Sequence, residues 1–168
     1  MQLEVKKIKT LKGKIEVPSD KSLSHRAVML GALCKGKVNI TNFSKGEDCQ
    51  NTLKIFQQMG AKVNFKDEKN FSLNSKGLLK PEKPLYAGNS GTTTRLLSGI
   101  LAGQNFNSTL YGDESLSKRP MKRVINPLSQ MGANIEHNDF KAPLNFIGEK
   151  EDQKLNFPFK EVHLKYLG

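Results

Sequence analysis

Arginine, lysine and hydroxyl side chains gather in three short stretches of this sequence, beside glycine, serine or aspartate. The stretches are SDKSLSHR (19–26), GNSGTTTR (88–95) and GDESLSKRP (112–120). Of the 27 basic residues only four are arginines, and all four lie in these stretches or just after the last one. Because arginine is suited to a bidentate grip on phosphate and carboxylate groups, the three stretches predict a site for a small anionic molecule.

The first stretch is predicted to begin a helix, with Asp20 among its capping residues. Ser22 and Arg26 are four residues apart and therefore share one face of that helix. A helix N-terminus also offers unpaired N–H groups. One anion can thus be met by the Ser22 hydroxyl, the Arg26 guanidinium and the Lys21 ammonium together. His25 is interpreted as a structural polar residue rather than a catalytic base.

The second stretch is rich in glycine. Gly88 and Gly91 let the backbone approach a ligand closely, and Arg95 adds a charge one turn into the expected helix. Three side chains of this stretch are potential hydrogen-bond donors: Asn89, Ser90 and Thr92. The alternative is an ordinary glycine-rich turn with a threonine as the N-cap of the helix. A P-loop is excluded because its Gly-Lys-Ser/Thr end is missing.

The third stretch contains the start of a further helix. Pro120 suits the first turn of a helix, which places Arg119 at the N-cap edge. A guanidinium in that position is suited to a carboxylate or a phosphate. Asp113 and Glu114 are expected to orient Arg119 through charge-assisted hydrogen bonds, and Arg123 is expected to face water.

A repeated phrase organises the elements that position these stretches. QQMGAKVNF (57–65) and SQMGANIEH (129–137) lie 72 residues apart. Each follows a helical apolar pattern and precedes a strand-like alternation. Gly60 and Gly132 then occupy the position of a left-handed helix C-cap.

An earlier helix precedes each phrase, over residues 21–34 and 93–102, and a strand-like run follows each helix. The apolar stripe of the first helix is expected to face the core: Leu23, Ala27, Leu30 and Cys34. The unit reads helix, strand, helix, strand, strand, with a short strand before the first helix. It occurs at about 14–78 and 84–148, so the sequence predicts an α/β fold of duplicated β-α-β-α-β-β units. Pro127 predicts a kink or a shortened first segment in the second copy's later helix.

The repeat places the first two stretches at equivalent positions, the start of the first helix in each copy. Bulk composition is that of a soluble globular protein, since 36% of residues are hydrophobic and no apolar segment is long enough to span a bilayer. Cys34 and Cys49 form no CxxC motif, which favours a reducing cytoplasm, and Cys34 is expected in the core. Nothing resembles a metal-ligand cluster.

The net charge of +11 raises the question of nucleic acid. Scattered lysines that are not interleaved with aromatic residues are typical of solvated surface, so we expect neither a nucleic-acid nor a membrane partner.

In their order and spacing, SDKSLSHRA, GNSGTTTRLL and GDESLSKRPM resemble the three N-terminal signature segments of the 5-enolpyruvylshikimate-3-phosphate synthase family. The QMGA phrases resemble its repeated units, so the resemblance covers about residues 15–148. It implies a lobe of the enolpyruvyl transferase type, an inside-out α/β barrel that is incomplete here. The implied reaction transfers the enolpyruvyl group of phosphoenolpyruvate to the 5-hydroxyl of shikimate 3-phosphate and releases phosphate. The resemblance also implies a cytoplasmic, monomeric enzyme of chorismate and aromatic amino acid biosynthesis that uses no metal or cofactor.

The resemblance carries roles over to individual residues. The implied substrate-binding residues are Lys21, Ser22, Arg26, Asn89, Gly91, Thr92 and Arg119. Lys21, Ser22 and Arg26 are implied to bind shikimate 3-phosphate. Lys21 is also implied to touch phosphoenolpyruvate and to be the catalytic residue, and the Gly91 backbone and Arg119 are implied to hold phosphoenolpyruvate.

The family enzyme has two lobes, so residues 1–168 are expected to be an N-terminal lobe fragment with two of three repeats and no second lobe. One alternative is a UDP-N-acetylglucosamine enolpyruvyl transferase, which typically carries Lys-Asn where this chain has Lys21-Ser22. A second is a basic, non-catalytic fragment that binds anions or nucleic acid. A third is a folded but inert remnant domain.

Overall fold

The structure is a computed structural model that describes residues 4, 7, 9–10, 12–15 and 17–148. The elements of the first half are α1 (Lys21–Leu33), β1 (Gly36–Ile40), α2 (Glu47–Gln58), β2 (Lys62–Phe65) and β3 (Phe71–Ser75). Those of the second half are β4 (Leu85–Tyr86), α3 (Gly91–Ala102), β5 (Ser108–Tyr111), α4 (Glu114–Ser117), α5 (Lys122–Gln130), β6 (Asn134–Asn138) and β7 (Lys141–Ile147). The predicted α/β fold is confirmed. The order helix, strand, helix, strand, strand recurs, and α4 is an addition in the second half.

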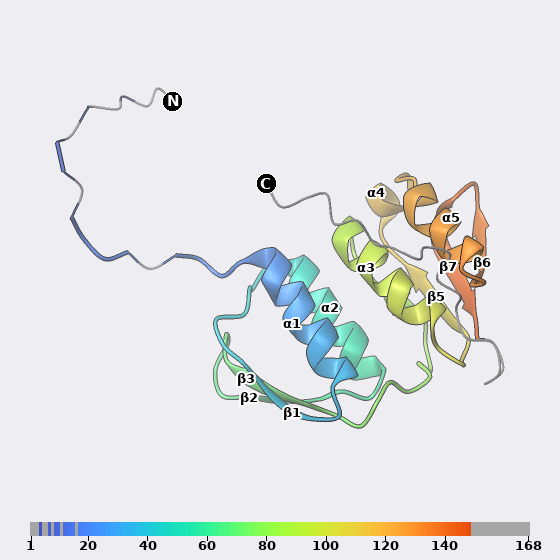
Figure 1. Ribbon diagram of the computed structural model, residues 1–168, viewed down its shortest axis with the longest axis horizontal. Coiled ribbons are helices and arrows are strands. Elements are labelled where there is room, and N and C mark those ends of the chain that lie inside the picture. The colour runs from blue at the N-terminus through green and yellow to red at the C-terminus, as the bar shows by residue number, and fades with distance from the viewer. Residues whose placement is uncertain (1–3, 5–6, 8, 11, 16, 149–168) are drawn as a thin grey trace.

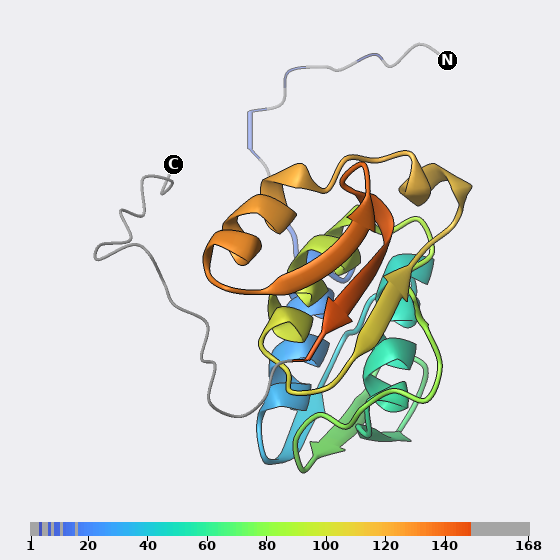
Figure 2. The same cartoon turned by 90° about the vertical axis from the view of Figure 1, so that its right-hand side faces the viewer.

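In Figure 1 one sheet lies below α1 and α2, and the other lies at the right, beyond α3. The first sheet has the strand order β1-β3-β2 and is antiparallel throughout. The second has the order β4-β5-β7-β6, in which only β4 and β5 are parallel. Helix α1 packs on the first sheet, α2 packs against α1 and α3, and α3 packs on the second sheet. Figure 2 looks onto the second sheet with α3 behind it.

Apolar side chains from both halves form one core. In the first sheet, fully buried Leu73 pairs with Val38 on one side and Val63 on the other. Phe71 meets Phe43 edge to face at 5.1 Å between ring centroids. Burying a side chain of this size stabilises the fold by about 1.5–3 kcal/mol. The core therefore fixes the helices, and with them the helix starts, against the sheets.

The predicted left-handed C-caps are confirmed. Gly60 follows α2 with φ of 95°, and Gly132 follows α5 with φ of 101°. L-residues with a side chain rarely adopt this conformation, so glycine ends both helices and turns the chain into the following strand. The repeated phrase in the sequence thus marks a repeated helix end.

Helix α1 turns a different face to the core than its apolar stripe predicts. Members of the predicted stripe are exposed or half-buried, with Leu23 and Leu30 at 67% and 61% exposure. The buried residues are Ser24, His25, Val28, Met29, Gly31 and Ala32. Ser24 and His25 hydrogen-bond in the interior, at 2.7 Å to a backbone carbonyl and 2.8 Å to a threonine hydroxyl. Because the Ser24 hydroxyl and Nδ1 of His25 have partners, burying these two groups is tolerated.

Two smaller expectations also need correction. Residues 12–15 and 17–20 form no strand before α1, whereas β4 gains β5 as a partner before α3. Cys34 is the exposed C-cap of α1 rather than a core residue. Helix α5, which contains Pro127, is nine residues long against twelve in α2, in line with the shortening expected there. In the part of the chain that the structure describes, we find no helix with the length and hydropathy of a membrane span.

Candidate anion-binding site

Lys21 is the first residue of α1. The N-cap residue Asp20 accepts the N–H of Leu23 at 2.6 Å, as the sequence predicts. The Lys21 ammonium forms an ion pair with Asp48 in the first turn of α2. The Asp48 side chain is 15% exposed and that of Lys21 is 58% exposed. The start of α1 is therefore fixed against the start of α2, while Lys21 stays accessible to a ligand.

Ser22 and Arg26 share the exposed side of the same helix turn, as predicted. Arg26 Nη1 donates to the backbone carbonyl of Ser22 at 3.1 Å. Among the described residues, the Ser22 hydroxyl has no hydrogen-bond partner and the Arg26 guanidinium has no carboxylate partner. Both groups are thus available to an anion.

A buried hydrogen-bond chain links the first turns of α1 and α3 through α2. His25 Nδ1 is 2.8 Å from Thr52 Oγ1, which is 2.8 Å from Thr93 Oγ1. Thr93 donates its hydroxyl to Ser90 Oγ at 2.7 Å. All four residues are buried. The sequence analysis did not single out Thr52 and Thr93. Polar residues within otherwise apolar helix faces are the pattern that could have identified them as buried hydrogen-bonding residues.

The proton count along this chain assigns the tautomer of His25. Thr93 gives its hydroxyl proton to Ser90, and Thr52 gives its single hydroxyl proton to the Asp48 carbonyl or to Thr93. In either case the Thr52 oxygen is left to accept the Nδ1–H of His25. His25 Nε2 is then the bare nitrogen, and it is buried without a partner in the described structure. A protonated ring would place an N–H there with no acceptor. Burial accordingly lowers the pKa of His25, and the Asp48 carboxylate opposes this shift only in part.

The glycine-rich stretch forms a tight turn and then the start of α3. Gly88 has φ of 61°, and a Cβ on it would stand 2.5 Å from Asn51 Nδ2. Ser90, not a threonine, is the N-cap, because its Oγ accepts the N–H of Thr93 at 3.1 Å. Ser90 is 1% exposed, and its Oγ accepts hydrogen bonds from Thr93 within the buried hydrogen-bond chain. Asn89 and Thr92 are exposed on either side of the helix start.

Two guanidinium groups converge on Gly91, the first residue of α3. Arg119 Nη1 lies 3.4 Å from the point where a Cβ on Gly91 would stand, and Arg95 Nη1 lies closer still. The second and third stretches of the sequence are thus brought together. The two guanidinium groups carry like charges and repel one another, so the arrangement favours an anion between them and the start of α3.

The third stretch is built differently from its prediction. Arg119 follows α4 and precedes the start of α5, so it does not cap that helix. Asp113 caps α4 instead of orienting the arginine, and Glu114 pairs with Lys118 at 2.5 Å. The Arg119 guanidinium contacts Ser115 Oγ at 3.4 Å. These differences arise because residues Glu114–Ser117 form a short helix, α4, which the periodicity did not predict.

The starts of α1, α2 and α3 therefore lie together. His25 Nδ1 and Thr93 Oγ1 are 3.5 Å apart. Lys21 stands one turn before His25, and Gly91 stands two residues before Thr93. The N-terminal ends of these helices, whose dipoles favour anions, are thus joined by one buried hydrogen-bond chain.

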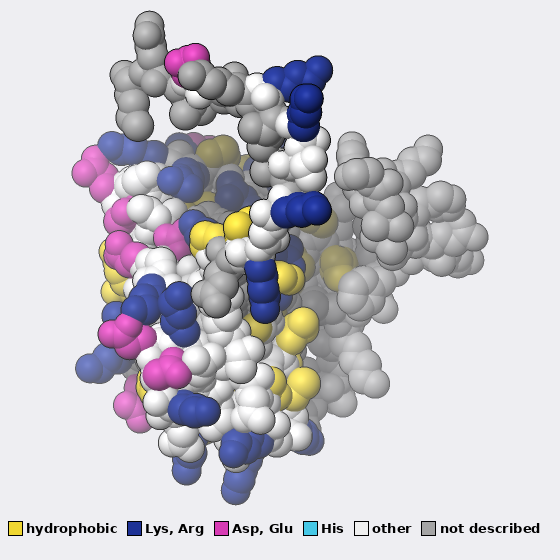
Figure 3. All heavy atoms as spheres, turned by 90° about the vertical axis from the view of Figure 1, so that its left-hand side faces the viewer, with side chains coloured by type: hydrophobic (Ala, Val, Ile, Leu, Met, Phe, Trp, Pro, Cys, Tyr) yellow, Lys and Arg dark blue, Asp and Glu magenta, His cyan; other side chains and the backbone are white. Residues whose placement is uncertain are grey.

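Basic residues elsewhere do not form a comparable group on the face that Figure 3 shows. Lys and Arg side chains are spread over that face and are interspersed with Asp and Glu. This distribution is that of a solvated surface rather than of a continuous track for a phosphate backbone.

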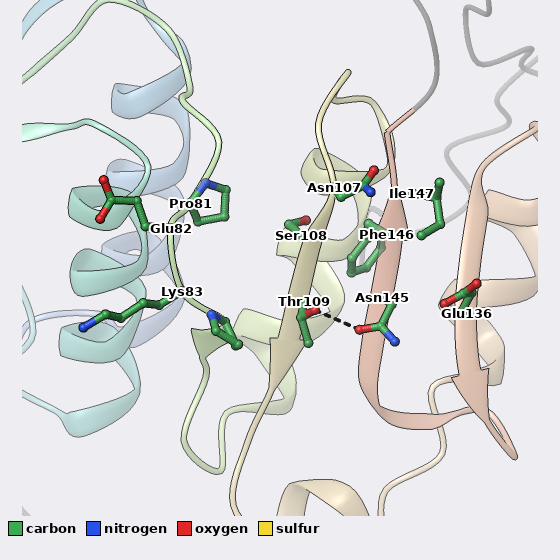
Figure 4. A pocket seen from close by; sticks show the side chains of 11 residues that line it. Pro81, Glu82, Lys83, Asn107, Ser108, Thr109, Glu136, Asn145, Phe146 and Ile147 are labelled. Carbon is green, nitrogen blue, oxygen red and sulfur yellow. Dashed lines mark hydrogen bonds between the residues drawn. The ribbon is translucent and has the colours of Figure 1, made fainter.

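A hollow of about 320 Å³ lies beside the second sheet, lined by residues 81–84 and by strands β5, β6 and β7 (Figure 4). Thr109 donates to Asn145 Oδ1 there at 2.8 Å, and Glu136 stands on the next strand. None of the residues from the three stretches lines this hollow. Within the described residues, no three or more His, Cys, Asp or Glu side chains are grouped as metal ligands.

Comparisons with known proteins agree on one family. A family model described as EPSP synthase (3-phosphoshikimate 1-carboxyvinyltransferase) matches residues 5–163. A 3-phosphoshikimate 1-carboxyvinyltransferase of Endomicrobium trichonymphae is 51% identical over 164 residues, which are 94% of this chain and 37% of the relative. One of Thermoanaerobacter sp. is 52% identical over 89% of this chain and 36% of the relative. The solved EPSP synthase of Acinetobacter baumannii matches with a TM-score of 0.78 and 40% identity, over 89% of this chain and 35% of that one. The chain thus spans about a third of the length of the relatives it matches.

Proposed function

Because the chain belongs to the EPSP synthase family, we propose that it supplies the N-terminal part of a site for enolpyruvyl transfer. The enolpyruvyl group passes from phosphoenolpyruvate to the 5-hydroxyl of shikimate 3-phosphate. A bond forms between the hydroxyl oxygen and the enolpyruvyl carbon, the bond from that carbon to the phosphate oxygen breaks, and the hydroxyl proton leaves with inorganic phosphate. The residues at about 14–78 and 84–148 form two units of the N-terminal lobe. The whole enzyme acts in the cytoplasm as a monomer in chorismate biosynthesis.

Shikimate 3-phosphate binds at the start of α1 in this proposal. The Ser22 hydroxyl and the Arg26 guanidinium share one exposed face, and neither has a carboxylate partner among the described residues. A phosphate dianion there gains charge-assisted hydrogen bonds and the favourable end of the helix dipole. When the phosphate binds, the Arg26 guanidinium gives up its weak contact with the Ser22 carbonyl and donates to the phosphate instead.

Phosphoenolpyruvate binds at the start of α3. The Gly91 N–H and the Arg119 guanidinium hold one anionic group of this substrate, and exposed Asn89 and Thr92 donate to it from either side. Glycine leaves room at this point for the anion and for the two arginines. A side chain at position 91 would occupy the space that Arg95 and the ligand share.

Lys21 acts on both substrates and is the catalytic residue. Its ammonium is oriented by Asp48 before substrates bind, and it stabilises the negative charge that develops on the departing phosphate. Holding the two substrates side by side supplies a further part of the rate enhancement. The observation that supports this assignment best is the convergence of the α1 and α3 starts, with Arg119 beside Gly91.

Calorimetric titration of shikimate 3-phosphate into the chain tests the proposal. We expect saturable binding that Lys21→Ala and Arg26→Ala each weaken about tenfold or more, since each removes a charge-assisted contact. Lys62→Ala is the matched control because it removes the same charge from an exposed position on β2. Arg119→Ala should weaken phosphoenolpyruvate binding to the chain saturated with shikimate 3-phosphate. No binding at millimolar ligand, or equal weakening by the control, contradicts the proposal.

A further inference from the structure

A second hollow, of about 620 Å³, opens where α5 begins. Its wall is made by Arg95, Pro120, Lys122, Arg123, Asn126 and Pro127. Arg95 comes from α3, and the other five residues come from α5 and the turn before it. The volume falls within the range of small-molecule sites. Arg123, expected from the sequence to face only water, is exposed and lines this hollow.

The charges around the hollow have one sign. Three of its lining side chains are cationic and none is acidic. In the described part of the chain, Arg95, Lys122 and Arg123 form no ion pair, although the exposed Lys45 pairs with Glu68. Uncompensated like charges around a concavity create a positive potential that a multivalent anion relieves.

One of these cations is held in place without being neutralised. Lys122 Nζ stands 5.3 Å from the centroid of the Phe140 ring, a cation–π contact that orients the ammonium and keeps its charge. Arg95 reaches Gly91 with Nη1 while lining the hollow. Pro120 and Pro127 add an apolar wall, so the hollow offers cationic groups beside a surface that can contact carbon atoms.

We propose that this hollow is a second anion site, which shares Arg95 with the site at Gly91 and is otherwise built from other residues, and that it binds the phosphate group of a small molecule. Lys122 and Arg123 hold the phosphate oxygens, and Asn126 donates a further hydrogen bond. The volume leaves room for an organic part, although inorganic phosphate shares the chemistry that is recognised. This site goes beyond the proposed function, because it needs neither shikimate 3-phosphate nor phosphoenolpyruvate.

Amide NMR titrations of the whole chain with inorganic phosphate and with glucose 6-phosphate test the proposal. We expect saturable shifts at Lys122, Arg123 and Asn126. The double variant K122A/R123A should weaken binding about tenfold or more, and Lys21→Ala should leave it unchanged. Tighter binding of glucose 6-phosphate supports a phosphorylated metabolite as the ligand, and tighter binding of inorganic phosphate supports the free ion.

The matched control is K62A/K66A, which removes two exposed charges from β2 and the turn after it. The proposal is overturned if neither anion binds saturably, if the control weakens binding as much as K122A/R123A, or if shifts appear only near Lys21 and Gly91. Because shikimate 3-phosphate is absent from these titrations, failure here leaves the proposed function untouched. Failure of the proposed function likewise leaves this site intact.

Discussion

Replacing Thr52 by valine tests whether the buried hydrogen-bond chain holds the helix starts together. The Thr52 hydroxyl contacts His25 Nδ1 at 2.8 Å, Thr93 Oγ1 at 2.8 Å and the Asp48 carbonyl at 3.1 Å. Valine has nearly the same shape, so the change removes hydrogen bonds without opening a cavity.

The magnitude follows from which partners are left without a bond. Thr93 keeps its bond to Ser90 at 2.7 Å, whereas His25 keeps only a 3.5 Å contact with Thr93. One buried ring N–H thus loses its close partner, and leaving such a group unsatisfied costs about 1–3 kcal/mol. The extra methyl group of valine offsets a small part of this. We therefore expect Thr52→Val to lower the free energy of unfolding by about 2 kcal/mol.

Urea unfolding followed by circular dichroism at pH 7.5 measures this difference from the shift in the midpoint. Thr92→Val is the matched control, since Thr92 is exposed in the first turn of α3, and its effect should stay within about 0.5 kcal/mol. Thr52→Ser keeps the hydroxyl and should remain more stable than Thr52→Val. A Thr52→Val variant as stable as the parent would refute the reasoning about the hydrogen-bond chain.

Three further predictions concern stability. Burial lowers the pKa of His25, so below about pH 6.5 the unfolded chain binds a proton that the folded chain does not bind. The free energy of unfolding should therefore fall as the pH drops below that value. His25→Asn should flatten this fall in urea titrations between pH 7.5 and 5. Asp20→Ala removes the N-cap of α1 and should cost about 1 kcal/mol in thermal unfolding, whereas an unchanged melting temperature would show that the cap is dispensable. Gly60→Ala places a side chain at φ of 95° with its Cβ 2.8 Å from Leu79 Cδ1, and it should lower the free energy of unfolding by about 1–2 kcal/mol. Gly132→Ala should lower it less, because the space around Gly132 is open. Equal losses would show that the Leu79 contact is irrelevant.

The sequence carried enough local information to predict the helix ends and the grouping of the three stretches. Gly60 and Gly132 have a local requirement, a positive φ, which a repeated phrase reveals without knowledge of tertiary contacts. Asp20 caps α1 through a bond within four residues of the chain. The meeting of Arg119 and Gly91 is what the family resemblance of the second and third stretches implies, whereas periodicity does not predict α4, which lies between them in the sequence.

The buried face of α1 lay beyond sequence reasoning for a physical reason. Leu23 and Leu30 form an apolar stripe at helical spacing, yet the face with Ser24 and His25 is the buried one. Helical periodicity shows which residues of α1 share a face, but it cannot show which polar residues have hydrogen-bond partners in the interior. The partner of His25 is Thr52, 27 residues away, and only tertiary structure brings them together.

The central claim is that the starts of α1 and α3 form one pocket for two phosphorylated substrates. Amide NMR of the chain, titrated with shikimate 3-phosphate and then with phosphoenolpyruvate, tests this claim most directly. The account predicts that the first ligand shifts the signals of Lys21, Ser22 and Arg26, and that the second shifts Gly91 and moves Lys21 again. Shifts confined to residues outside both helix starts, or a phosphoenolpyruvate response that leaves both Gly91 and Lys21 unmoved, would contradict it.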